Sequence, residues 1–261
     1  MRAIKRFSPD NIVRHMVERI DAAAAAEVPF YHLVLDGFFP AEIYQEMVDR
    51  MPTSDSFRAL PGRNNYNIRS DGTSTRVKID LFPEYLRHMD GVQKELWNSV
   101  GRALCAPAVK AAFIRRLAPG LKRRFGDAYP SVGMFPIPML TRDTDGYRIP
   151  EHTDTRWKGI TVQLYLPRDE SQNGIGTVFS ERLADGSFRR VTQMAFVPNH
   201  GYAFAVGDNT WHSVDAIGRQ PKPRDSILHT YFVDDTVFKK FRNRGKRVGN
   251  FLRNEVRQLG V

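Results

Sequence analysis

The stretch SVGMFPIPMLTRDTDGYRIPEHTDTRWKGITVQLYLP, residues 131–167, decides the fold. It holds two runs rich in β-branched and aromatic residues, 133–140 and 159–166, separated by Gly, Pro and Asp. Such runs, bounded by turn-forming residues, predict short strands. Similar runs follow at 177–180, 188–196, 202–206, 211–217 and 226–233. Many short strands at this spacing predict a sandwich or barrel over residues 131–233.

The part before residue 131 is expected to be mainly helical. Ser8-Pro9-Asp10 is a strong helix start, the alanine run 22–26 favours continuation of that helix, and Pro29 stops it. Further helices are expected near 41–51, 84–104 and 107–124, with a first strand near 30–36. The polar segment 53–80 is long for a passive connection and is a candidate lid or binding loop. We therefore expect one α+β domain over 1–261, with a helical part (1–130), a β core (131–233) and a basic helical tail (234–261).

Composition narrows the class of protein. The single cysteine, Cys105, excludes an internal disulfide, and no apolar run approaches the length that spans a bilayer. No apolar stretch follows the basic start, so we expect no secretory signal and a cytoplasmic protein. The net charge is +10, and residues 234–259 hold eight Lys or Arg against three acids. This tail is either a solvated basic helix or a contact for an anionic surface or polymer.

Three residues have the chemistry of a metal site. His152 and Asp154 stand two apart in an extended segment, so both side chains point to one face, and His212 follows 58 residues later in a predicted strand. Two histidines and one carboxylate with open positions form the facial triad of non-heme iron(II) oxygenases. A second His-x-Asp pair, His88 and Asp90, lies in a predicted helix, where residues two apart project about 200° from each other. We therefore interpret that pair as surface residues.

A fourth element lies 12 residues after His212, where Arg224-Asp225-Ser226 opens the last predicted strand. Arg224 and Ser226 point to the same face of that strand. A guanidinium holds a carboxylate through two parallel hydrogen bonds, and a serine hydroxyl can add a third. A dicarboxylate could therefore chelate a metal at one end and meet Arg224 at the other.

The order H-T-D, W-H-S-V and R-D-S resembles the iron(II)- and 2-oxoglutarate-dependent dioxygenases. The lead-in from Leu140 through Gly146-Tyr147 and the segment VLDGFFP at 34–40 also look like that family, and the resemblance covers roughly residues 30–233. It implies a double-stranded β-helix, a cupin-like jelly roll with N-terminal helices packed on one sheet. It also implies that His152, Asp154 and His212 are the catalytic iron ligands, and that Arg224 and Ser226 bind the distal carboxylate of 2-oxoglutarate.

The resemblance further implies a reaction. 2-Oxoglutarate and O2 would be consumed, succinate and CO2 released, and an unactivated C–H bond of the substrate oxidised. The related halogenases have a small residue where this chain has Asp154, so hydroxylation is favoured over halogenation.

The substrate is less constrained by the sequence. Tyr165 or Gln163 could hydrogen-bond 2-oxoglutarate, and a further set could contact substrate: Arg156, Trp157, Tyr147, Arg63, Arg69 and Arg76. Trp211 and His229 face the other way and are expected in the core. We favour a small anionic substrate such as a free or carrier-bound amino acid. The alternatives are a macromolecule or a sugar acid of a membrane lipid, and a non-catalytic jelly-roll binding protein. The position oxidised, hydroxylation versus desaturation or cyclisation, and the oligomeric state stay open.

Overall fold

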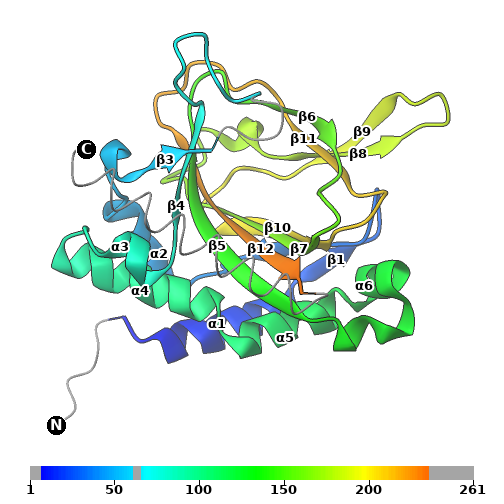
Figure 1. Ribbon diagram of the computed structural model, residues 1–261, viewed down its shortest axis with the longest axis horizontal. Coiled ribbons are helices and arrows are strands. Elements are labelled where there is room, and N and C mark those ends of the chain that lie inside the picture. The colour runs from blue at the N-terminus through cyan, green and yellow to red at the C-terminus, as the bar shows by residue number, and fades with distance from the viewer. Residues whose placement is uncertain (1–6, 61–65, 235–261) are drawn as a thin grey trace.

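The computed structural model describes residues 7–60 and 66–234, drawn in colour in Figure 1. The predicted tail helix therefore lies almost entirely outside the described residues, as does Arg63.

Two antiparallel sheets form the centre of the molecule (Figure 1). The larger has eight strands in the order β1 (Ala24–Ala26), β2 (His32–Asp36), β10 (His200–Ala205), β7 (Lys158–Tyr165), β12 (Arg224–Val233), β5 (Met134–Asp143), β4 (Arg76–Asp80), β3 (Arg58–Ala59). The smaller has four, in the order β6 (Ile149–His152), β11 (Trp211–Val214), β8 (Val178–Arg182), β9 (Phe188–Gln193). The predicted double-stranded β-helix with helices on one sheet is thus confirmed.

The helices lie along the outer face of the larger sheet (Figure 1). They are α1 (Pro9–Ala22), α2 (Ala41–Asp49), α3 (Pro83–Leu86), α4 (Gly91–Leu104), α5 (Pro107–Arg116) and α6 (Ala118–Phe125). Between helices and sheet lies an apolar core whose members, such as Met16, Leu33, Trp97, Phe113 and Ile227, are fully buried. This layer leaves the inner face of the larger sheet to the smaller sheet and to the site. Within the described residues, no helix is long and apolar enough to cross a membrane.

Three local expectations were wrong. Helix α1 ends at Ala22, and Ala24–Ala26 forms strand β1 instead, paired with β2. The polar segment 53–80 is not a continuous loop, because it contains β3 and β4, which both join the larger sheet; its role as a lid or binding segment stays a prediction. The predicted helix 84–104 is interrupted, because α3 ends at Leu86 and the Asp90 carboxylate caps the start of α4 by accepting from the Gln93 N–H. The Asp90 carboxylate is therefore engaged as a helix cap. This capping role, and not a position on the opposite face of one helix, is what sets Asp90 apart from His88.

Candidate metal centre and adjoining cavity

The three predicted ligands converge. Strand β6 pairs with β11, and the register sets His152 directly opposite His212, with ring centroids 4.3 Å apart. Strand β6 ends at His152, and Asp154 follows in the turn that leads to β7. One ligand atom from each of the three residues lies within 4.8 Å of the other two. Neighbouring strand ends therefore bring together residues that are far apart in the sequence.

Each imidazole is oriented by a backbone carbonyl. His152 Nδ1 lies 2.9 Å from the Pro150 oxygen, and His212 Nδ1 lies 2.9 Å from the Thr210 oxygen. A carbonyl only accepts, so each Nδ1 carries the proton and each Nε2 keeps its lone pair for a metal. Burial, followed by the neighbouring His212, lowers the pKa of His152 to about 4, and burial lowers the pKa of His212 as well. Both rings are therefore neutral at neutral pH, the state that binds metal.

The Asp154 carboxylate is held ready as an anion. Burial alone would raise its pKa, but the positive charge of Lys158, with hydrogen bonds from Lys158 and Thr161, holds the pKa of Asp154 well below its usual value. Lys158 Nζ donates to Oδ1 at 2.5 Å, and the Thr161 hydroxyl donates to Oδ2 at 2.6 Å. Lys158 did not emerge from the sequence as a site residue. Its four-residue spacing from Asp154 is the one sequence signal that could have revealed it.

A row of charges crosses three strands at the other end of the site. The register places Asp143 on β5 opposite Arg76 on β4 and opposite Arg224 on β12. Arg76 Nε donates to one Asp143 oxygen at 2.7 Å, and Arg224 Nη1 donates to the other at 2.7 Å. The three side chains are 9%, 0% and 1% exposed in the order Arg76, Asp143, Arg224. Two cations and one anion leave a buried surplus of one positive charge, which suits a ligand carboxylate.

A small cavity of about 70 Å³, lined mainly by buried residues, joins the two ends. His152, Asp154 and His212 line it, and so do Arg224 and Arg76. It has room for about two water molecules, and Lys158 is also in its wall. Tyr147 Oη and Gln163 Nε2, on two further residues that line this cavity, have no hydrogen-bond partner among the described residues. Those two polar atoms are available to a ligand.

Other predicted contacts are not brought to this cavity. The Ser226 hydroxyl lies 2.9 Å from Thr141 Oγ1. The Tyr165 hydroxyl accepts from the Thr177 N–H at 3.0 Å and donates to Thr177 Oγ1 at 3.1 Å, while its ring lies 5.2 Å from the Arg224 guanidinium carbon. Ser226 and Tyr165 therefore support the wall in which Arg224 lies, and their hydroxyls are already engaged.

Three predicted substrate residues lie in three different places, none of them in this cavity. The Arg69 guanidinium donates to the Thr144 hydroxyl at 2.9 Å and to the Asp145 carbonyl at 2.7 Å, so it joins two loops. The Trp157 side chain is 58% exposed and lines neither cavity. Arg156 lines a second, larger cavity next to Asp154. For the expected core residues, His229 is fully buried and Trp211 is partly buried.

Comparison with known proteins gives a fold and no sequence family. No protein-family model matches the chain, and no curated protein matches it in sequence. Among solved structures, a prolyl hydroxylase from Trichoplax adhaerens, in complex with a hypoxia inducible factor peptide fragment, is similar at 14% identity and TM-score 0.51, over 86% of this chain and 90% of that chain. A Pseudomonas putida prolyl-4-hydroxylase is similar at 15% identity and TM-score 0.49, over 85% and 98%. The chain therefore has the fold of the Trichoplax prolyl hydroxylase.

Proposed function

We propose that this chain is an iron(II)- and 2-oxoglutarate-dependent oxygenase that hydroxylates an unactivated C–H bond of an anionic substrate, with release of succinate and CO2. One observation carries the proposal. The His152, Asp154 and His212 triad and Arg224 line the same cavity. A site that bound only a metal would not need the buried Arg224 in the same cavity.

The donor set fits ferrous iron. Two neutral imidazoles and one carboxylate bind on one side of an ion and leave its other positions open. Iron bound there, with 2-oxoglutarate and O2, would supply the oxidant for C–H cleavage. The chain's own contribution is to fix both Nε2 atoms, through the carbonyls of Pro150 and Thr210, and to exclude water around the reacting groups.

The cosubstrate is bound at the other end of the cavity. Arg224 holds the distal carboxylate of 2-oxoglutarate, and the Arg76–Asp143 pair sets the orientation of Arg224 and the local charge. The unpartnered Gln163 amide and Tyr147 hydroxyl donate to the bound molecule. Lys158, which pairs with Asp154 in the metal-free protein, would yield that carboxylate to a bound metal. The similarity of fold to a prolyl hydroxylase supports this proposal.

The test is 2-oxoglutarate consumption with matched succinate release by the iron-loaded protein, across a panel of amino acids, peptides and sugar acids. We expect turnover in the unchanged protein and none in Asp154→Ala. His88→Ala, which removes a histidine of the other His-x-Asp pair, is the matched control and should keep full turnover. Turnover that survives Asp154→Ala would contradict the proposal. Tight metal binding with no turnover on any substrate would favour the non-catalytic alternative.

A further inference from the structure

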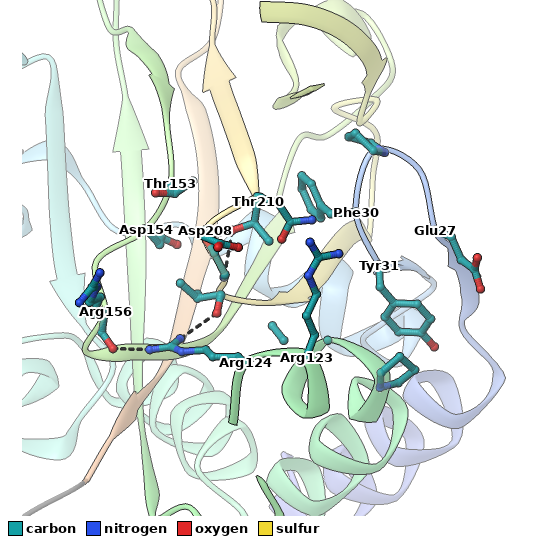
Figure 2. A pocket seen from close by; sticks show the side chains of 17 residues that line it. Glu27, Phe30, Tyr31, Arg123, Arg124, Thr153, Asp154, Arg156, Asp208 and Thr210 are labelled. Atoms are coloured by element: carbon teal, nitrogen blue, oxygen red, sulfur yellow. Dashed lines mark hydrogen bonds between the residues drawn. The ribbon is translucent and has the colours of Figure 1, made fainter. Parts of the chain in front are cut away.

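A second cavity, of about 720 Å³, opens on the other side of Asp154. Figure 2 shows its wall, which is formed by Thr153 and Asp154 beside the triad, by the segment 205–210, by Phe30 and Tyr31 and by helix α6. Asp154 lines both cavities. A molecule in the larger cavity would therefore lie next to the metal centre, on the side away from Arg224.

Helix α6 closes one side of this cavity because it packs very near strand β10. A Cβ placed on Gly120 would come 2.9 Å from Ala205 Cβ, so this approach requires glycine. The Arg124 guanidinium then donates to the carbonyls of Arg156, Lys158 and Val206. Arg124 thus fixes α6 to the turn next to the metal ligands, and its Nη1 and Nη2 donors are engaged in these contacts.

Two other arginines of this cavity have free donors. Arg123 comes from α6, one residue before Arg124, and Arg156 comes from the turn after Asp154. Figure 2 shows the Arg123 side chain rising from α6 into the middle of the cavity, between Tyr31 and Thr210. Neither guanidinium has a hydrogen bond or ion pair within the described residues. Both are therefore available to a ligand.

The charges around the cavity favour an anion. Arg123, Arg124 and Arg156 stand against two acids, Glu27 and Asp208, once Asp154 is set aside as neutralised by Lys158 or by a metal. Three cations and two anions leave a surplus of one positive charge. In Figure 2 the Glu27 carboxylate lies at the outer rim and points away from Arg123. Arg123 is thus the positive group that faces the interior, whereas Arg156 lies at the edge of the cavity (Figure 2).

We propose that this cavity binds the substrate, and that Arg123 in its middle recognises the anionic group, a carboxylate or a phosphate, with Arg156 at its edge adding positive charge (Figure 2). Cavities of roughly 300–1,000 Å³ hold ligands of drug size, so this cavity has room for a substrate larger than a free amino acid. The half-buried Tyr31 side chain in the wall packs against its apolar part. Identification of this ligand as the substrate rests on the proposed function, whereas binding of the anion does not.

The experiment is calorimetry with the full-length protein, without metal or 2-oxoglutarate. The probes are phenyl phosphate and phenylacetate, with benzyl alcohol as the uncharged comparison. The variants are Arg123→Gln, Arg156→Gln and the double variant. The matched control is Lys122→Gln, which removes the same charge from the neighbouring residue of α6, whose ammonium pairs with Asp127 outside the cavity.

We expect one of the two anions to bind saturably, benzyl alcohol not to bind, and the double variant to weaken anion binding by about tenfold or more, the loss typical of a charge-assisted hydrogen bond. The tighter anion identifies the class of acidic group. Lys122→Gln should leave binding within about twofold of the unchanged protein. Arg224→Met should also leave it unchanged, because Arg224 lines the other cavity.

Three results would overturn the inference: no binding of either anion, equal binding by the double variant, or binding lost only in Arg224→Met. These results are separate from the test of the proposed function. A protein that binds the anion through Arg123 and Arg156 but never consumes 2-oxoglutarate would keep this inference and lose the proposed reaction.

Discussion

Replacement of Arg224 by methionine should separate cosubstrate binding from stability. Methionine keeps an apolar stem of similar length and removes the guanidinium, which is 1% exposed. The lost contacts are those to the Ile175 carbonyl at 2.8 Å, to Asp143 at 2.7 Å and to Thr177 Oγ1 at 3.4 Å. Asp143 is not left as an isolated buried charge, because Arg76 still donates to it at 2.7 Å and 3.3 Å.

The two expected magnitudes follow from those contacts. A hydrogen bond to a charged group contributes about 1.5–3 kcal/mol, so loss of two bonds to the 2-oxoglutarate carboxylate costs at least about 3 kcal/mol, or about 100-fold in affinity. The free energy of unfolding should fall by about 1–3 kcal/mol, well below the roughly 3–5 kcal/mol for an uncompensated buried charge.

The assay has an internal control on the same two strands. Arg142 and Asp225 form the next ion pair along β5 and β12, at 2.8 Å and 3.0 Å, and their side chains point to the opposite face of the sheet. Arg142→Met should therefore leave the affinity for 2-oxoglutarate unchanged. It should destabilise the fold at least as much as Arg224→Met, because it leaves the buried Asp225 carboxylate without its ion-pair partner. Affinity would be measured by calorimetry on the metal-loaded protein without oxygen, and stability by urea unfolding.

Two results would refute this reasoning. Equal loss of 2-oxoglutarate affinity in Arg224→Met and Arg142→Met would mean that both act through the fold alone. Unchanged affinity in Arg224→Met would mean that another group holds the distal carboxylate.

Three further predictions follow from single contacts. Lys158→Met removes the cation that competes with a metal for Asp154. The metal affinity should therefore rise by about tenfold, while the melting temperature of the metal-free protein falls. A lower metal affinity, measured by calorimetry, would contradict this. His229 is fully buried and has no hydrogen-bond partner among the described residues, and burial lowers its pKa to about 3. Its contribution to stability is therefore present above pH 6.5 and lost as the pH falls. His229→Leu should therefore lose less stability between neutral pH and about pH 4, by up to about 3 kcal/mol, and parallel pH curves would be evidence against it. Gly201→Val should fail to give soluble folded protein, because a Cβ there lies 2.2 Å from the Gln163 carbonyl; normal unfolding cooperativity would exclude this clash.

The β core and most helices could be predicted from the sequence because their apolar residues recur at strand or helix spacing. Strand β4 could not be predicted, because charged residues at both of its ends are buried in place of apolar ones. Arg76 and Asp80 are buried and Val77 is only partly so. Burial of these charges is possible only because Asp143 and Arg58 on neighbouring strands pair with them. The sequence alone does not reveal such a partner 67 residues away.

Strand β1 was missed for a different reason. Alanine favours helix locally, but Ala24–Ala26 pairs with β2, and the hydrogen bonds of that ladder outweigh a small local preference. The charge-pairing Asp143 was also missed, since it has no motif of its own. The triad was accessible because a metal needs a fixed set of side chains in a recognisable order. The roles of these residues stay predictions.

The central claim is that His152, Asp154 and His212 bind one ferrous ion, and anaerobic iron(II) titration followed by calorimetry tests it most directly. We expect one ion per chain for the unchanged protein and for His88→Ala, and a loss of at least about 100-fold in affinity for His212→Ala. Stoichiometric, equally tight binding by His212→Ala would contradict the claim, because the ion would then lie elsewhere.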